Sequence, residues 1–136
     1  MRRGPPKLNE LTKEDSVEKV NLKAKLELIH EHWTPKIVAE VGDMHVKLAK
    51  IEGEFVWHAH ELEDELFMVI SGTLTMELRG RAPIILEPGE VLVVPRGVEH
   101  RPVARDEVQI LMFEPKTTLN TGTAEGDRTV AEPEWI

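Results

Sequence analysis

Two histidines and four carboxylates lie between positions 58 and 65, and this stretch holds the residues best suited to chemistry. On a β-strand, side chains two residues apart project to the same side, so we expect His58 and His60 to point together while Trp57 and Ala59 face away. Two imidazoles side by side can chelate a metal ion. The pair alone is also compatible with two surface histidines on an edge strand.

Further ligands would have to come from neighbouring strands. Glu65 opens the apolar run Leu66 to Ile70 and is the preferred carboxylate; Glu63 shares its alternation but falls in the expected turn. His100 follows a rigid turn that begins at Pro95 and could reach the same centre. Three neutral imidazoles and one carboxylate suit one divalent Fe, Mn, Ni, Co, Cu or Zn ion, and octahedral coordination would leave two positions open for water or substrate. Open positions indicate ligand binding or catalysis.

Other candidates have simpler interpretations. Phe67 and Met112 are candidates for a pocket wall, although apolar residues on strands are more often core. His30 and His32 follow a short helix, where the helix dipole favours histidine. His45 shares a strand face with Lys47, which predicts that both face solvent.

The elements that must position these residues are mostly strands. Apolar alternation and β-branched runs predict strands over 36–41, 44–49, 55–60, 66–70, 73–78, 84–86, 91–94 and 108–113, separated by glycine and proline turns. Asn21 can cap one short helix from Leu22 to Ile29. Many short strands at regular spacing predict an all-β sandwich or barrel.

Length and charge limit the class of protein. A chain of 136 residues forms one core, so we expect an N-terminal arm over 1–18, a barrel with its preceding helix over 19–116 and an extension over 117–136, pinned by Trp135. The net charge of -8 argues against nucleic acid as a partner. No apolar run is long enough to span a membrane, and no apolar signal core follows the first residues, so a cytoplasmic location is expected.

Two separated motifs resemble those of the cupin superfamily. Gly53, His58-x-His60, Glu65 and Gly72 resemble the first, and Gly89, Pro95-x-Gly97 and His100 resemble the second. The first glycine-to-histidine gap is one residue short, and Ala104 replaces a frequent asparagine, but neither departure touches a metal ligand. The resemblance implies an antiparallel jelly-roll barrel, the ligands His58, His60, Glu65 and His100, and a homodimer.

The wider stretch resembles single-domain cupins described as mannose-6-phosphate-isomerase-like, through Glu114-Pro115 and Asn120-Thr121-Gly122. Such a resemblance implies a metalloenzyme that acts on a small oxygenated metabolite by dioxygenase or isomerase chemistry. The chain has no tyrosine and offers no evident general base outside the ligand set, which favours oxygen activation or Lewis-acid catalysis. The alternative is a non-catalytic cupin that binds or senses a small molecule.

Overall fold

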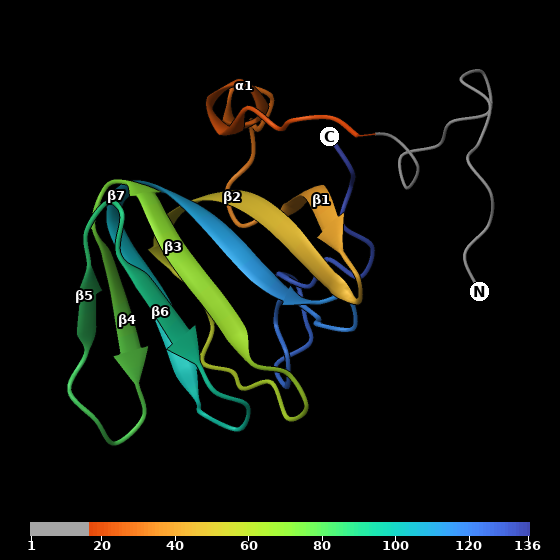
Figure 1. The fold of residues 1–136 in the computed structure, drawn as a ribbon. Helices are drawn as coiled ribbons and strands as arrows, with labels where there is room; N and C mark the ends of the chain where they lie inside the picture. Colours follow the sequence, from red (N-terminus) through yellow and green to blue (C-terminus); the bar gives the residue numbers. More distant parts are fainter. Residues whose placement is uncertain (1–16) are drawn as a thin grey trace.

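The computed structural model describes residues 17–136 and shows one short helix and seven strands in that range. The expected N-terminal arm lies outside the described residues, except for positions 17 and 18. The elements, drawn in Figure 1, are α1 (Leu22–Leu26), β1 (Lys36–Val41), β2 (Met44–Glu54), β3 (Glu65–Ser71), β4 (Leu74–Leu78), β5 (Ile84–Leu86), β6 (Val91–Val94) and β7 (His100–Pro115).

Strand β7 is the centre of the sheet. All strand pairings are antiparallel, and the main path runs β1-β2-β7-β3-β6, while β4 joins β7 and β5 joins β4. The N-terminal end of β7 pairs with β4 and its C-terminal part with β3, so one long strand belongs to both halves of the barrel. The predicted all-β antiparallel jelly roll with a short N-terminal helix is confirmed.

Strand β2 is covered on both faces. One face contributes Ala49 and Ile51 to the main core inside the barrel. The other face contributes Leu48 to a second cluster, which Leu26 and Ile29 of the helix region complete. Figure 1 shows α1 outside the barrel. Burial on both sides follows because the helix covers the face that would otherwise meet solvent.

The prediction that His45 and Lys47 face solvent is wrong. Lys47 is only 2% exposed and lies on the interior face, where its Nζ donates to Glu114 Oε1 at 2.9 Å. His45 is partly buried, bonds to Glu40 and packs against the edge of Trp135. Alternation identified the shared face correctly, but it assumed that the polar face was the outer one.

Several elements differ in extent from the predicted ones: β2 continues to Glu54, and β7 starts at His100 rather than at Val108. The helix starts at the predicted cap, where Asn21 Oδ1 accepts from Ala24 N, but it ends at Leu26 rather than at Ile29. Residues 55–60 do not form the predicted continuous strand and hold only an isolated bridge at His58. Tertiary contacts at His58 replace regular strand pairing there.

The C-terminal extension returns to the body of the protein at β1, where Trp135 forms a bridge with Ile37. Ile37 N donates to Glu134 O, and Ile136 N donates to Ile37 O. Ile136 also packs against the second cluster. Within the described residues, no helix has the length and apolar character needed to cross a membrane.

Replacing Ile29 by alanine is expected to destabilise the fold by about 2–5 kcal/mol, because the side chain is fully buried between helix and sheet and its loss leaves a cavity. Leu28 is the matched control, since it is 56% exposed and its replacement by alanine should cost far less. Urea denaturation of both variants measures the difference. Equal losses would contradict the packing role given to the second cluster.

Candidate metal centre

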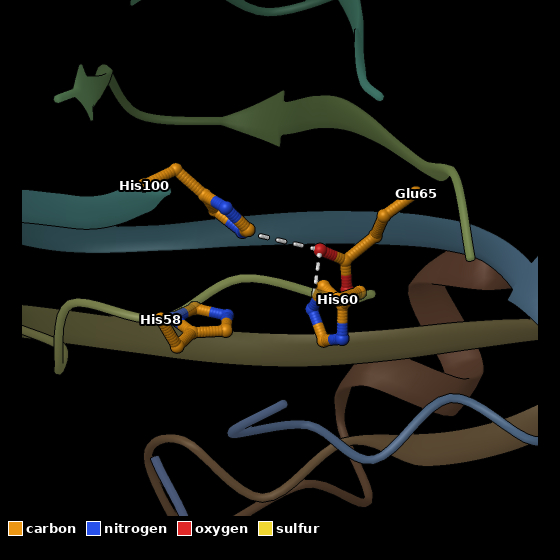
Figure 2. Close-up of side chains that lie close together, drawn as sticks. All are labelled: His58, His60, Glu65 and His100. Carbon is orange, nitrogen blue, oxygen red and sulfur yellow. Dashed lines mark ion pairs between the residues drawn. The ribbon is translucent and has the colours of Figure 1, made fainter. Parts of the chain in front are cut away.

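Four buried side chains meet inside the barrel: His58, His60, Glu65 and His100. Figure 2 shows the Glu65 carboxylate directed toward the rings of His60 and His100, with His58 beside them. One potential ligand atom from each residue lies within 4.8 Å of all the others. Ligands at about 2.0–2.2 Å from an ion lie at most about 4.4 Å apart, so a small contraction would bring all four to one centre.

The two motifs are joined by backbone pairing. His58 N donates to His100 O at 3.0 Å, and His100 N donates to His58 O at 2.8 Å. Gly97 N donates to His60 O, and Arg96 N donates to the carboxylate of Asp64. The turn before His100 is therefore held against the stretch that carries the other histidines, and Glu65 enters as the first residue of β3.

Backbone carbonyls fix the orientation of two rings. Nδ1 of His58 lies 2.9 Å from Val56 O, and Nδ1 of His100 lies 2.9 Å from Val98 O. A carbonyl accepts only, so Nδ1 carries the proton in both rings and Nε2 keeps its lone pair. This is the tautomer that binds a metal through Nε2, with the second nitrogen held by an outer partner.

Several buried polar atoms at the centre have no hydrogen-bond partner. They include Nε2 of His60, Nε2 of His100 and Oε1 of Glu65. The two nitrogens lie 3.2 and 3.4 Å from Glu65 Oε1 without forming well-aligned hydrogen bonds. Buried polar atoms are nearly always satisfied, so this group of atoms fits a bound cation, which would satisfy them together. The residues present fit a divalent metal.

Burial favours the neutral form of the His58 imidazole. It lowers the pKa of His58 to about 4, and the neighbouring His100 contributes in the same direction. Burial alone would raise the pKa of Glu65, but its contacts with Glu114, His100 and His60 outweigh that effect and hold the pKa well below its usual range. A neutral imidazole beside an ionised carboxylate at neutral pH is the state needed for metal binding.

Sequence reasoning missed a buried ion pair next to this centre. Lys47 and Glu114, each at most 2% exposed, pair across β2 and β7. Burial and the nearby charge of Glu65 raise the pKa of Glu114 well above its usual range, although Lys47 opposes this. The signal available in the sequence was the strand parity that places Lys47 with Ala49 and Ile51, two core residues.

A cavity of about 40 Å³ lies beside the four side chains. Its walls include His58, Glu65 and Glu114, as well as Phe67 and Met112, the two residues singled out as pocket candidates. This volume holds a few water molecules or ligand atoms. Phe67 and Met112 therefore line the cavity. Their role in ligand binding stays a prediction.

The mouth of the cavity is formed by Trp33 and Asn120. Both line the cavity and both are partly exposed, whereas Glu65 and Glu114 at its inner end are buried. Asn120 belongs to the C-terminal extension, whose involvement here was not anticipated. Gly122 lies so close to Ala59 O and to the His60 ring that a side chain would collide with them. The available signal was Asn120-Thr121-Gly122 itself, where the structure places Gly122 at a φ of 50° that favours glycine.

The remaining candidates have other partners. Glu63, the rival carboxylate, accepts a hydrogen bond from Thr117 Oγ1 and is not part of the cluster. His32 pairs with Glu107 at the surface. Trp57 faces away from the histidines, as alternation predicts, and lies under the guanidinium of Arg79.

Comparison with known proteins gives the family. The family model for the cupin domain matches residues 44–114, more than half of the chain. Together with the barrel and the gathered histidines, this match shows that the chain belongs to the cupin family.

Similar proteins are known from several bacteria. A cupin-2 domain containing protein from Shewanella frigidimarina is 45% identical, with a TM-score of 0.69, over 71% of this chain and 94% of that one. Protein NMB1881 from Neisseria meningitidis is 28% identical, with a TM-score of 0.68, over 73% of this chain and all of its own. The uncharacterized protein YdbB from Bacillus subtilis is 38% identical over 64 residues, which are 47% of this chain and 57% of YdbB.

The metal-free protein should lose stability as the pH falls from about 6.5 to about 4. Unfolded His58 titrates near 6.5 but folded His58 only near 4, so the unfolded chain binds more protons in this window and the free energy of unfolding falls. His58 accounts for about 3 kcal/mol of the free energy of unfolding; this contribution is fully present above pH 6.5 and is lost as the pH falls to about 4. Urea denaturation across this range, compared between wild type and His58→Gln, measures it. The same pH dependence in both would contradict the assignment.

Proposed function

We propose that this cupin is a metalloenzyme that acts on a small oxygenated metabolite, by dioxygenase or isomerase chemistry, at one divalent transition metal held by His58, His60, Glu65 and His100. One observation carries the proposal: Nε2 of His60, Nε2 of His100 and Oε1 of Glu65 are buried without hydrogen-bond partners, and potential ligand atoms of all four residues lie within 4.8 Å of one another. We also propose that the protein is cytoplasmic and that the chain divides into an arm, a barrel and an extension.

A divalent ion at this site would supply Lewis-acid or oxygen-binding chemistry, with a formal site charge of +1 from three neutral imidazoles and one carboxylate. The chain itself supplies orientation and an apolar environment. Val56 O and Val98 O hold the rings of His58 and His100 with Nε2 directed inward. Phe67, Met112 and Ile110 line the adjacent cavity, where apolar walls exclude water and strengthen electrostatic contacts with a ligand.

The test is elemental analysis of tag-free protein, beside His60→Ala, His100→Ala and the control Glu63→Gln. Near-stoichiometric metal is expected in wild type and in the control, since Glu63 bonds to Thr117 instead of joining the cluster. Each histidine variant should lose most of its metal because one ligand is missing. Full metal retention in either histidine variant, or loss in Glu63→Gln, would show that the ligand set is different.

Catalysis is tested on the same preparations. Oxygen consumption and isomerase assays with a panel of hydroxylated small molecules should give turnover in wild type and at least a hundredfold less in His100→Ala. A metal-loaded wild type that binds members of the panel without turning any over would favour the non-catalytic alternative, a cupin that binds or senses a small molecule.

We also propose that the protein is a homodimer, supported by apolar side chains on its edge strands. Ile85 of β5 is 60% exposed, and Val91 and Val93 of β6 are about half exposed. Within the described residues, β5 pairs only with β4 and β6 only with β3, so each leaves an open edge. Exposed apolar edges are typical sites of association.

Val93→Glu is expected to convert a dimer into a monomer, because it places a charge in the centre of the apolar edge. Leu62→Glu is the control, since Leu62 is 81% exposed but lies outside these strands. Light scattering gives the molar mass of each. A monomeric wild type would refute the dimer, and a dimeric Val93→Glu would place its interface elsewhere.

A further inference from the structure

We propose that Arg128, held at the mouth of the cavity by Asn120, is a specificity-determining residue that selects a ligand with an oxyanion at the end remote from the metal. This inference rests on the proposed function, because it takes the other end of the ligand to be coordinated at the four-residue centre. It adds the chemical class of the ligand: a small molecule with oxygen donors at one end and a carboxylate or phosphate group at the other.

An aromatic stack leads from the metal centre to Arg128. The Phe55 ring meets the His58 ring edge-on, with centroids 5.3 Å apart. Phe55 stacks on Trp33 at 4.8 Å with an interplanar angle of 18°, and both rings line the cavity. The guanidinium carbon of Arg128 lies 5.3 Å from the Trp33 ring centre and 5.9 Å from that of Phe55. The cation is therefore close to the mouth of the cavity.

The guanidinium of Arg128 has no carboxylate partner among residues 17–136. Among the described residues, Arg79 pairs with Glu99, and Arg101 with Glu54 and Glu77, whereas Arg81, Arg96 and Arg105 also lack an ion pair. Arg128 differs from these three because it lies against aromatic rings that line the cavity. The Arg128 side chain is exposed. It has no ion pair with any described residue even though carboxylates are abundant in a chain with a net charge of -8. A guanidinium kept out of ion pairs retains its fork of N–H donors, which matches a carboxylate or phosphate group.

The position of Arg128 is fixed by its own backbone. Asn120 Nδ2 donates to Arg128 O at 2.8 Å, while Asn120 Oδ1 accepts from Val130 N at 2.8 Å. The hydroxyls of Thr121 and Thr129 share a further hydrogen bond of 2.7 Å. Since Asn120 itself lines the cavity, the segment that carries Arg128 is tied to the cavity wall.

Trp33 shows the same pattern of local constraint. Its φ of 60° is in the left-handed region, which bulky residues rarely adopt. Trp33 N donates to Lys50 O, and its indole Nε1 donates to Glu52 O. These two bonds hold the ring in place despite the unfavourable backbone, and such outliers are concentrated at ligand-binding sites.

The probes for this inference are three molecules of matched length. Succinate has a carboxylate at both ends, succinamate replaces one of them by a neutral amide, and 3-phosphonopropionate replaces one by a phosphonate. Isothermal titration calorimetry measures their affinities for wild type, Arg128→Gln and the control Arg81→Gln, each with Zn²⁺ bound and metal-free. Arg81 is an exposed arginine in the turn between β4 and β5.

Wild type is expected to bind succinate at least tenfold more tightly than succinamate, and Arg128→Gln should lose this preference while keeping its metal content and its stability. Arg81→Gln should behave as wild type. Tighter binding of the phosphonate identifies a phosphate-bearing ligand, and tighter binding of succinate a carboxylate. An unchanged preference in Arg128→Gln, or no measurable binding of any probe by wild type, overturns the inference. Absence of metal in wild type would instead refute the proposed function, and the metal-free titrations would still test Arg128.

Discussion

The reciprocal pair of backbone hydrogen bonds between His58 and His100 is the constraint on which the site depends. Each residue donates to and accepts from the other, so two motifs that lie far apart in the chain meet in one fixed register. The two rings are then oriented by carbonyls two residues earlier, Val56 O and Val98 O. Backbone geometry thus determines where both lone pairs point, and no side-chain network is needed to orient these two rings.

The interior of the barrel holds several buried charged and polar side chains. Glu65, Lys47 and Glu114 are buried together with three imidazoles, and removing charges from water costs several kcal/mol per ion unless they are paired. Lys47 offsets part of this cost by pairing with Glu114. A divalent cation among Glu65 and the imidazoles would offset more, so metal binding and folding stability are expected to be coupled.

The segments on either side of the central strands support the site in different ways. The second cluster, with Leu26 and Ile29, covers the outside of β2 and turns a strand that would have faced solvent into a wall with two buried faces. The C-terminal extension contributes to the site itself. Asn120 lines the cavity, and Gly122 packs against the stretch that carries His60. Segments at both ends of the described chain therefore shape a site whose proposed ligands all lie in the middle.

Much of the fold and of the candidate site was predictable from local pattern. The period of two placed His58 with His60, and Glu65 with Phe67, and glycine and proline turns separated most of the strands correctly. Two motifs in the right order were enough to indicate the cupin barrel. These features are local, since strand alternation and turn chemistry depend on residues close in sequence.

Only the tertiary structure decided which face of β2 is the interior one. Lys47 was predicted at the surface because alternation separates the two faces of a strand but does not say which one is interior. The apolar face with Leu48 is the outer one, and it is buried because a distant helix region covers it. Several decisive contacts join residues remote in sequence: Lys47 pairs with Glu114, His58 bridges His100, and Asn120 lines a cavity together with His58 and Glu65. Such contacts follow from strand register and chain closure, which a single sequence does not encode locally.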